Sequence, residues 1–194
     1  MLTNVARAWG ARVIQPVANL LTRLGLHPNT ATLLGFALNV VVAVILAAGH
    51  LRLAGGLLIL TLTFDAVDGT MARTQGKVSR FGAFLDSTLD RWTELLLYTG
   101  VVWYYLNTDQ QTGVLLAVAA LGASFMVSYA RARAEGVGFA CKEGIFTRFE
   151  RLLVLIIGLL FGPLLWALVL IAALAGATAV QRILIVWRAD RAGA

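Results

Sequence analysis

Four aspartates at fixed spacing are the residues of this sequence whose chemistry most needs an explanation. Asp65 and Asp68 are three positions apart, Asp86 and Asp90 are four apart, and the flanking segments are almost entirely apolar. A carboxylate at the centre of a membrane-spanning helix costs about 2.5 to 3.5 kcal/mol on insertion scales, so such groups usually mark sites of function. Residues three or four apart share one face of a helix. The spacing therefore predicts two acidic helix faces that meet across a turn.

The same four carboxylates predict a metal site. At close range they repel one another unless a counter-charge compensates them. Two divalent cations would cancel four negative charges, and oxygen-only ligands suit hard ions such as Mg²⁺ or Mn²⁺. Two metals can stabilise both the attacking and the leaving oxygen of a phosphoryl displacement. We predict such a two-metal site; the alternative is that the aspartates only cap helix ends near the lipid headgroups.

The segment that contains these aspartates resembles the signature of the CDP-alcohol phosphotransferase family, D-x2-D-G-x2-A-R-x8-G-x3-D-x3-D. The resemblance implies an all-α integral membrane enzyme, acting as a homodimer, that moves a phosphatidyl-type group from a CDP-linked lipid such as CDP-diacylglycerol to an alcohol and releases CMP. The positions that fit the signature, without departure, are Asp65, Asp68, Gly69, Ala72, Arg73, Gly82, Asp86 and Asp90.

The resemblance also assigns roles. All four aspartates would hold the metals, and Asp90 would in addition accept the proton of the attacking hydroxyl. Arg73 would offset the diphosphate charge. The segment HPNTAT at residues 27–32 reads as a helix start from physics alone, and it is similar to the family's entry into its first span. The residues that would then contact the CDP-lipid are Asn29, Thr32, Asp68, Gly69, Ala72, Arg73 and Gly82.

A second group of candidate functional residues lies in residues 128–152, which are rich in arginine. The stretch resembles the subgroup that makes phosphatidylinositol phosphate from inositol phosphate, although Arg131 stands where that subgroup is expected to have lysine. Guanidinium groups match phosphate oxygens. Inositol phosphate is the first acceptor that this predicts and glycerol phosphate the second, while the alternative is that these bases only set topology. The predicted acceptor-phosphate residues are Ser128, Arg131, Arg148 and Arg151.

Composition places the whole chain in a membrane. Its 194 residues are 59% hydrophobic and 13% charged, with a mean hydropathy of +0.81. The pattern predicts a single domain over residues 1–194, with an N-terminal amphipathic interfacial helix at 1–26 and a six-helix bundle at 31–187. The predicted transmembrane helices cover residues 31–49, 53–74, 81–106, 112–133, 147–161 and 164–187.

The distribution of charge predicts the orientation. Of the 16 Lys and Arg residues, all except Arg52 fall on one side of the six-span arrangement. The positive-inside rule then gives a multi-pass protein of the cell (plasma or inner) membrane, with both termini and the aspartates cytoplasmic. The net charge of +6 therefore serves orientation, and we expect no nucleic-acid partner.

A cation transporter is the rival from another class, because intramembrane carboxylates can form a permeation path. Transport sites lie near the bilayer midplane and involve broken helices. Here the carboxylates are predicted to crowd the cytoplasmic end, beside Arg73 and Lys77. Release of CMP from a CDP-lipid would separate the two classes.

Overall fold

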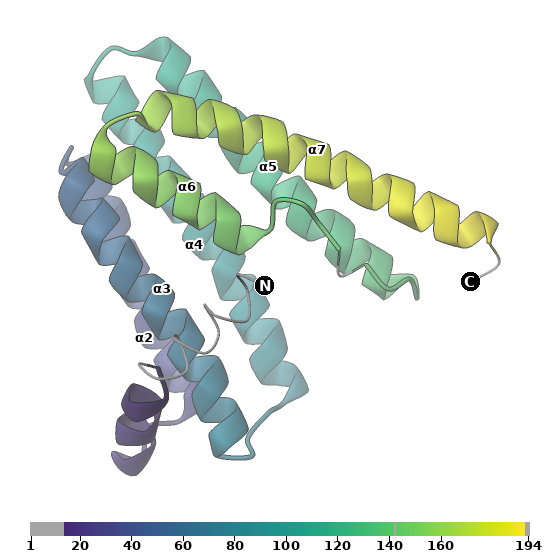
Figure 1. The fold of residues 1–194 in the computed structure, drawn as a ribbon. Helices are drawn as coiled ribbons and strands as arrows, with labels where there is room; N and C mark the ends of the chain where they lie inside the picture. The colour runs from purple at the N-terminus through teal and green to yellow at the C-terminus, as the bar shows by residue number, and fades with distance from the viewer. Residues whose placement is uncertain (1–13, 142, 193–194) are drawn as a thin grey trace. The chain divides into compact units, whose positions relative to one another are not determined.

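The structure is a computed structural model that describes residues 14–141 and 143–192 (Figure 1). These residues are helical almost throughout and contain no strand, which confirms the all-α prediction. Each predicted span coincides with one observed helix, and the largest difference is at the end of the last helix, Arg191 instead of residue 187. Besides a helical stretch over residues 14–23, the helices are α2 Pro28–Ala47, α3 Leu51–Thr74, α4 Arg80–Asn107, α5 Gln111–Gly136, α6 Arg148–Phe161 and α7 Leu164–Arg191.

Three of the described helices, α2, α5 and α7, are long and apolar enough to cross a membrane. The prediction counted six. The helices α3 and α4 have 24 and 28 residues, which is ample length, but they carry the charged residues of the signature. The helix α6 has only 14 residues, fewer than the roughly 20 that a bilayer core requires. The structure thus supports an all-helical membrane protein, with three clear candidate spans.

The chain forms two compact units, and three helices contribute to both. The first unit comprises the residues up to Val42 together with Leu57–Thr93. The second comprises Ala43–Gly56 and the residues from Glu94 onward. The predicted carboxylate site belongs to the first unit and the predicted acceptor arginines belong to the second.

In the first unit the helical stretch at residues 14–23 packs on α2 and α3. Gln75, just after α3, fastens it there: its Nε2 donates to the Thr22 hydroxyl and to the Leu26 carbonyl, each at 3.1 Å. The predicted interfacial helix is therefore helical over residues 14–23 and ends before residue 26, and its residues 1–13 lie outside the described part. The buried residues of the contact are Ala18, Ala31, Val67 and Met71, with Ile14, Leu21 and Leu26 packed against them.

In the second unit α5 runs beside α7, and α6 packs against α7 (Figure 1). The buried faces of α5 and α7 are rich in small side chains, among them Ala117, Ala120, Ala175 and Ala179. Lipid tails are as apolar as leucine, so helices in membranes associate through close backbone packing at such small residues. The segment between α5 and α6 also contacts α7, because the Ile145 backbone N–H donates to Gln181 Oε1 at 3.2 Å.

Candidate functional site

Three of the four predicted metal ligands lie within electrostatic range of one another in the first unit. Asp68 on α3 is buried, with 7% of its surface exposed, whereas Asp65 is half-buried and Asp86 on α4 is exposed. The negative charges of Asp65 and Asp86 both act on Asp68. Two helices that are separated by a short turn thus bring like charges together, as the spacing predicted.

The chemistry of these side chains suits a hard divalent cation, because every donor is a carboxylate oxygen. Like charges around a buried carboxylate are costly, and a cation offsets that cost. Within residues 14–141 and 143–192, however, no three Asp, Glu, His or Cys side chains are gathered closely enough to hold one ion. The donor set therefore fits the predicted metals, and the two-metal cluster stays a prediction.

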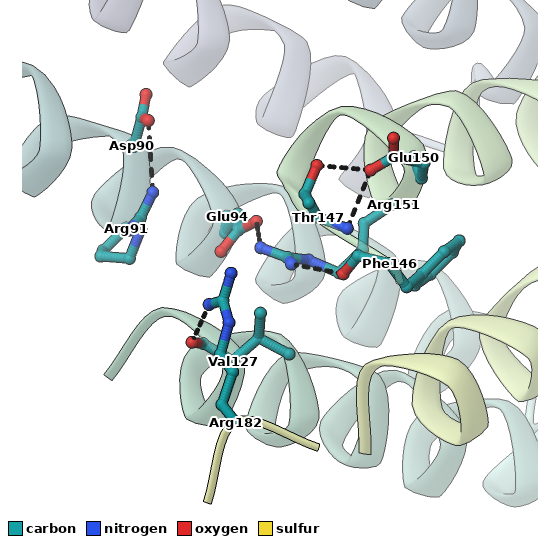
Figure 2. Close-up of polar contacts among 9 residues, drawn as sticks. All are labelled: Asp90, Arg91, Glu94, Val127, Phe146, Thr147, Glu150, Arg151 and Arg182. Carbon is teal, nitrogen blue, oxygen red and sulfur yellow. Dashed lines mark hydrogen bonds and ion pairs between the residues drawn. The ribbon is translucent and has the colours of Figure 1, made fainter. Parts of the chain in front are cut away.

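Asp90, the predicted proton acceptor, is paired with its neighbour in the sequence. Its Oδ2 accepts from Arg91 Nη2 at 3.2 Å (Figure 2). The two side chains are 18% and 29% exposed, and pairs that solvent reaches contribute at most about 1 kcal/mol. This pair alone does not lock the Asp90 carboxylate in one position.

The start of α2 supplies polar groups to the carboxylate helices. The Thr32 hydroxyl lies within hydrogen-bonding reach of the Asp68 carboxylate, and 3.2 Å from the Pro28 carbonyl oxygen. A Cβ atom at Gly82 would lie 3.2 Å from Asn29 Oδ1. The predicted donor-side residues Asn29, Thr32 and Gly82 thus lie beside the signature residues of the same unit, and Gly82 leaves space for a neighbouring side chain.

Ser79 is a residue of this region to which the sequence analysis assigned no role. Its hydroxyl accepts the Gly82 backbone N–H at 2.9 Å, which caps the first turn of α4. A Cβ at Gly82 would lie 3.1 Å from the same hydroxyl oxygen. The available signal was a serine just ahead of a predicted helix, because serine is a favoured N-cap residue. Ser79 and Asn29 together define the space around Gly82.

The Arg73 side chain lies along α3, close to Thr70 and Gly69. Its Nη2 donates to the Thr70 hydroxyl at 3.1 Å, and its Nη1 would be 3.7 Å from a Cβ at Gly69. A Cβ at Gly69 would thus be in ordinary van der Waals contact with the guanidinium one turn later. Ala72 lies between Gly69 and Arg73 in the sequence and is half-buried. Its small side chain adds little bulk to this stretch of α3.

The predicted acceptor residues lie in the second unit and differ in exposure. Ser128 on α5 and Arg148 at the start of α6 are half-buried, whereas Arg131 is exposed. The Arg131 Nε donates to Glu135 Oε1 at 2.9 Å. Arg151 is buried, with 2% of its surface exposed.

Arg151 is held by the protein at two of its nitrogens. Its Nη2 pairs with Glu94 Oε1 at 2.6 Å, and its Nη1 donates to the Phe146 carbonyl oxygen at 3.4 Å (Figure 2). The buried Nε has no hydrogen-bond acceptor in the described part of the chain. A buried donor of this kind is costly unless a ligand or water satisfies it.

A capping box fixes where α6 begins. The Thr147 backbone N–H donates to Glu150 Oε2 at 2.8 Å, and the Thr147 hydroxyl contacts the same carboxylate. Such reciprocal contacts satisfy the otherwise unpaired donors of a first turn. They place Arg148 and Arg151 on the first turn of α6.

Arg182 on α7 is a further buried arginine that the sequence analysis treated only as a topology signal. Its Nε donates to the Glu143 carbonyl at 3.0 Å. Its Nη1 donates to the Val127 carbonyl (Figure 2). The positive charges of Arg131 and Arg151 act on it. The signal that could have found it was a charge inside an apolar helix. Arginines from α5, α6 and α7 are thus gathered in one place, an arrangement that favours an anion.

Comparison with known proteins identifies the family of this chain. The chain belongs to the CDP-alcohol phosphatidyltransferase family, whose sequence pattern matches residues 25–187. It is therefore an enzyme of this class, which removes the transporter alternative.

Among its relatives, the phosphatidylinositol phosphate synthase of Corynebacterium glutamicum is 41% identical over 76% of this chain and 68% of that protein. The archaetidylinositol phosphate synthase of Methanothermobacter thermautotrophicus is 37% identical over 91% of this chain and 90% of the relative.

A solved structure agrees with the fold. The phosphatidylinositol phosphate synthase of Mycobacterium tuberculosis, in a crystal structure with CDP-DAG bound, matches with a TM-score of 0.86 and 32% identity, over 91% of this chain and 94% of that one. A second crystal structure of that enzyme, in complex with manganese and citrate, matches with a TM-score of 0.83, 33% identity, and coverage of 90% and 88%.

Proposed function

We propose that this protein transfers a phosphatidyl group from CDP-diacylglycerol to a hydroxyl of inositol phosphate and releases CMP. The observation that carries the choice of acceptor is the gathering of Arg131, Arg151 and Arg182 in the second unit. Such a group of guanidiniums suits a phosphorylated acceptor. The names of the relatives, which include phosphatidylinositol phosphate and archaetidylinositol phosphate synthases, support the same choice.

The chemistry is a displacement at phosphorus. The acceptor hydroxyl oxygen attacks the phosphorus that carries the diacylglycerol, the bond from that phosphorus to the bridging oxygen breaks, and CMP leaves with this oxygen. Asp90 takes the hydroxyl proton. Arg73 offsets diphosphate charge, and Asn29, Thr32, Gly69, Ala72 and Gly82 shape the space for the CDP moiety. Divalent cations, held by Asp65, Asp68, Asp86 and Asp90, would when bound neutralise the developing charge.

The acceptor would be recognised through its phosphate. Arg131 and Arg148 reach it from α5 and from the start of α6, with Ser128 beside them, and the buried Arg151 offers its unsatisfied Nε–H. Charge-assisted contacts of this kind are stronger than neutral hydrogen bonds. An acceptor without a phosphate would leave buried donors unsatisfied and bind weakly.

The purified full-length protein tests this assignment. Given CDP-diacylglycerol and Mg²⁺, it should release CMP rapidly with inositol phosphate and much more slowly with free inositol, serine or glycerol phosphate. A higher rate with glycerol phosphate would replace the acceptor but keep the class. Absence of CMP release with every acceptor would overturn the proposed reaction.

We further propose that all six helices from α2 to α7 cross the membrane of the cell, with both termini and the carboxylates in the cytoplasm, and that the chain forms a homodimer. The support for the orientation is the distribution of basic residues, all but Arg52 on one side. Single cysteines from Lys77→Cys and Asn107→Cys, in a Cys141→Ser background, should label from opposite sides of sealed vesicles. Labelling from one side would contradict the six-span arrangement.

A further inference from the structure

We infer that Glu94 is a positioning residue of the acceptor site, which acts by holding the Arg151 guanidinium in the orientation that binds the acceptor phosphate. The inference rests on the proposed function. It concerns a residue outside the family signature, one helical turn after Asp90 on α4. The structure gives Glu94 a buried arginine, Arg151, as its partner.

The contact between the two side chains is short and buried from solvent. Glu94 and Arg151 expose 1% and 2% of their surfaces, and Glu94 Oε1 lies 2.6 Å from Arg151 Nη2. The Phe146 carbonyl oxygen accepts a hydrogen bond from a second nitrogen of Arg151, Nη1, at 3.4 Å. With these two nitrogens held, the guanidinium plane has little freedom. The Nε–H is the donor that remains without a protein acceptor among the described residues.

A purely structural explanation does not account well for this pair. Taking two charges out of water is costly, and replacing a buried ion pair by apolar residues of similar volume is often neutral or stabilising. The surrounding helices already pack through small apolar side chains, as at Ala117 and Ala175. A carboxylate in this interior gains most by keeping a functional arginine charged and oriented.

The other charges of the cluster are arranged differently. Arg131 pairs with the exposed Glu135, whereas Arg182 uses the backbone carbonyls of Val127 and Glu143. Glu94 is thus the buried carboxylate that serves this group of arginines. Three arginines against two glutamates leave the group with a net positive charge, which suits an anionic acceptor.

The surroundings of the pair include a buried tyrosine. Tyr98 lies one turn after Glu94 on α4, exposes 3% of its surface, and feels the charges of both Glu94 and Arg151. The ion pair therefore lies in the buried interior of the second unit.

The test is a double-mutant cycle on the full-length enzyme. Glu94→Gln keeps the size of the side chain and removes its charge. We expect it to raise the apparent KM for inositol phosphate by about tenfold, as for the loss of one oriented charge-assisted contact, with the KM for CDP-diacylglycerol unchanged. Arg151→Met should raise the acceptor KM by at least as much. Adding Glu94→Gln to Arg151→Met should change it no further, because Glu94 acts only through Arg151.

Thr61→Val is the matched control, since it removes another buried polar contact, the 3.1 Å hydrogen bond to Asn39, without touching either cluster. Its acceptor KM should equal that of the wild type. Equal rises in both substrate KM values for Glu94→Gln, or a further rise in the double variant, would overturn the inference. If Glu94→Gln alone does not fold, the comparison of the double variant with Arg151→Met decides. A wild type that releases no CMP would instead overturn the proposed function.

Discussion

The carboxylate cluster of the first unit and the arginine cluster of the second are built in opposite ways. Asp65, Asp68 and Asp86 come from one continuous run of sequence, and the charges that act on Asp68 include those of its like-charged neighbours. The arginines come from three different helices, and Arg151 and Arg182 are each held by acceptors of the protein itself. The first cluster therefore gathers like charges, which the proposed cations would offset, whereas contacts within the protein already hold Arg151 and Arg182 of the second.

The largest effect should follow from removing one charge from the carboxylate cluster. Asp86→Asn and Asp90→Asn keep the size of the side chain, so the protein should fold, but turnover should fall by about a hundredfold or more. A chelator should abolish wild-type activity, and added Mg²⁺ or Mn²⁺ should restore it. Near-normal rates of CMP release in both variants would contradict the metal role of this cluster.

A smaller effect should follow from filling the space beside the cluster. In Gly82→Ala the new Cβ would lie 3.1 Å from Ser79 Oγ and 3.2 Å from Asn29 Oδ1, so both side chains must shift by a few tenths of an ångström. We expect the KM for CDP-diacylglycerol to rise about three- to tenfold and the acceptor KM to stay constant. Gly56→Ala, whose Cβ meets nothing within 4 Å, is the control. A change in the acceptor KM alone would contradict the proposal that Gly82 lies at the CDP-diacylglycerol site.

The smallest effect should come from the exposed partner of the arginine cluster. Glu135 pairs with Arg131 where both side chains are about half exposed, 45% and 46%. Pairs of this kind contribute about 0.2 to 1 kcal/mol, so Glu135→Gln should alter the acceptor KM by less than about fivefold. Glu94→Gln should have the larger effect because its contact is buried. A larger rise in the acceptor KM for Glu135→Gln than for Glu94→Gln would contradict the view that the buried carboxylate contributes more to acceptor binding.

The nearness of Asp65, Asp68 and Asp86 could be predicted from the sequence for a physical reason, whereas the two-metal site stays a prediction. The residues of the carboxylate cluster are three and four positions apart on consecutive helices, and helical periodicity alone brings Asp65 and Asp68 to one face. The helices themselves were equally accessible, because long apolar stretches separated by short turns define them. The number of these helices that cross the membrane was harder to predict. The helix α6 is short, and α3 carries the charges that catalysis is proposed to need.

The arginine cluster could only be predicted in part. Arg131 and Arg151 lie in one basic stretch of sequence, but Arg182 joins them through the packing of α7 beside α5, which no local pattern encodes. The partnership of Glu94 with Arg151 joins positions on two helices that are far apart in sequence, at 2.6 Å. Long-range contacts of this kind require the fold.

The central claim is that the two clusters serve different substrates, and Arg148→Ala tests it most directly. Both apparent KM values should be measured with the full-length enzyme, CDP-diacylglycerol, inositol phosphate and Mg²⁺. Losing one charge-assisted contact costs about 1.5 to 3 kcal/mol, so the KM for inositol phosphate should rise about ten- to a hundredfold while that for CDP-diacylglycerol stays unchanged. A rise in the CDP-diacylglycerol KM with an unchanged acceptor KM would contradict the division between the clusters.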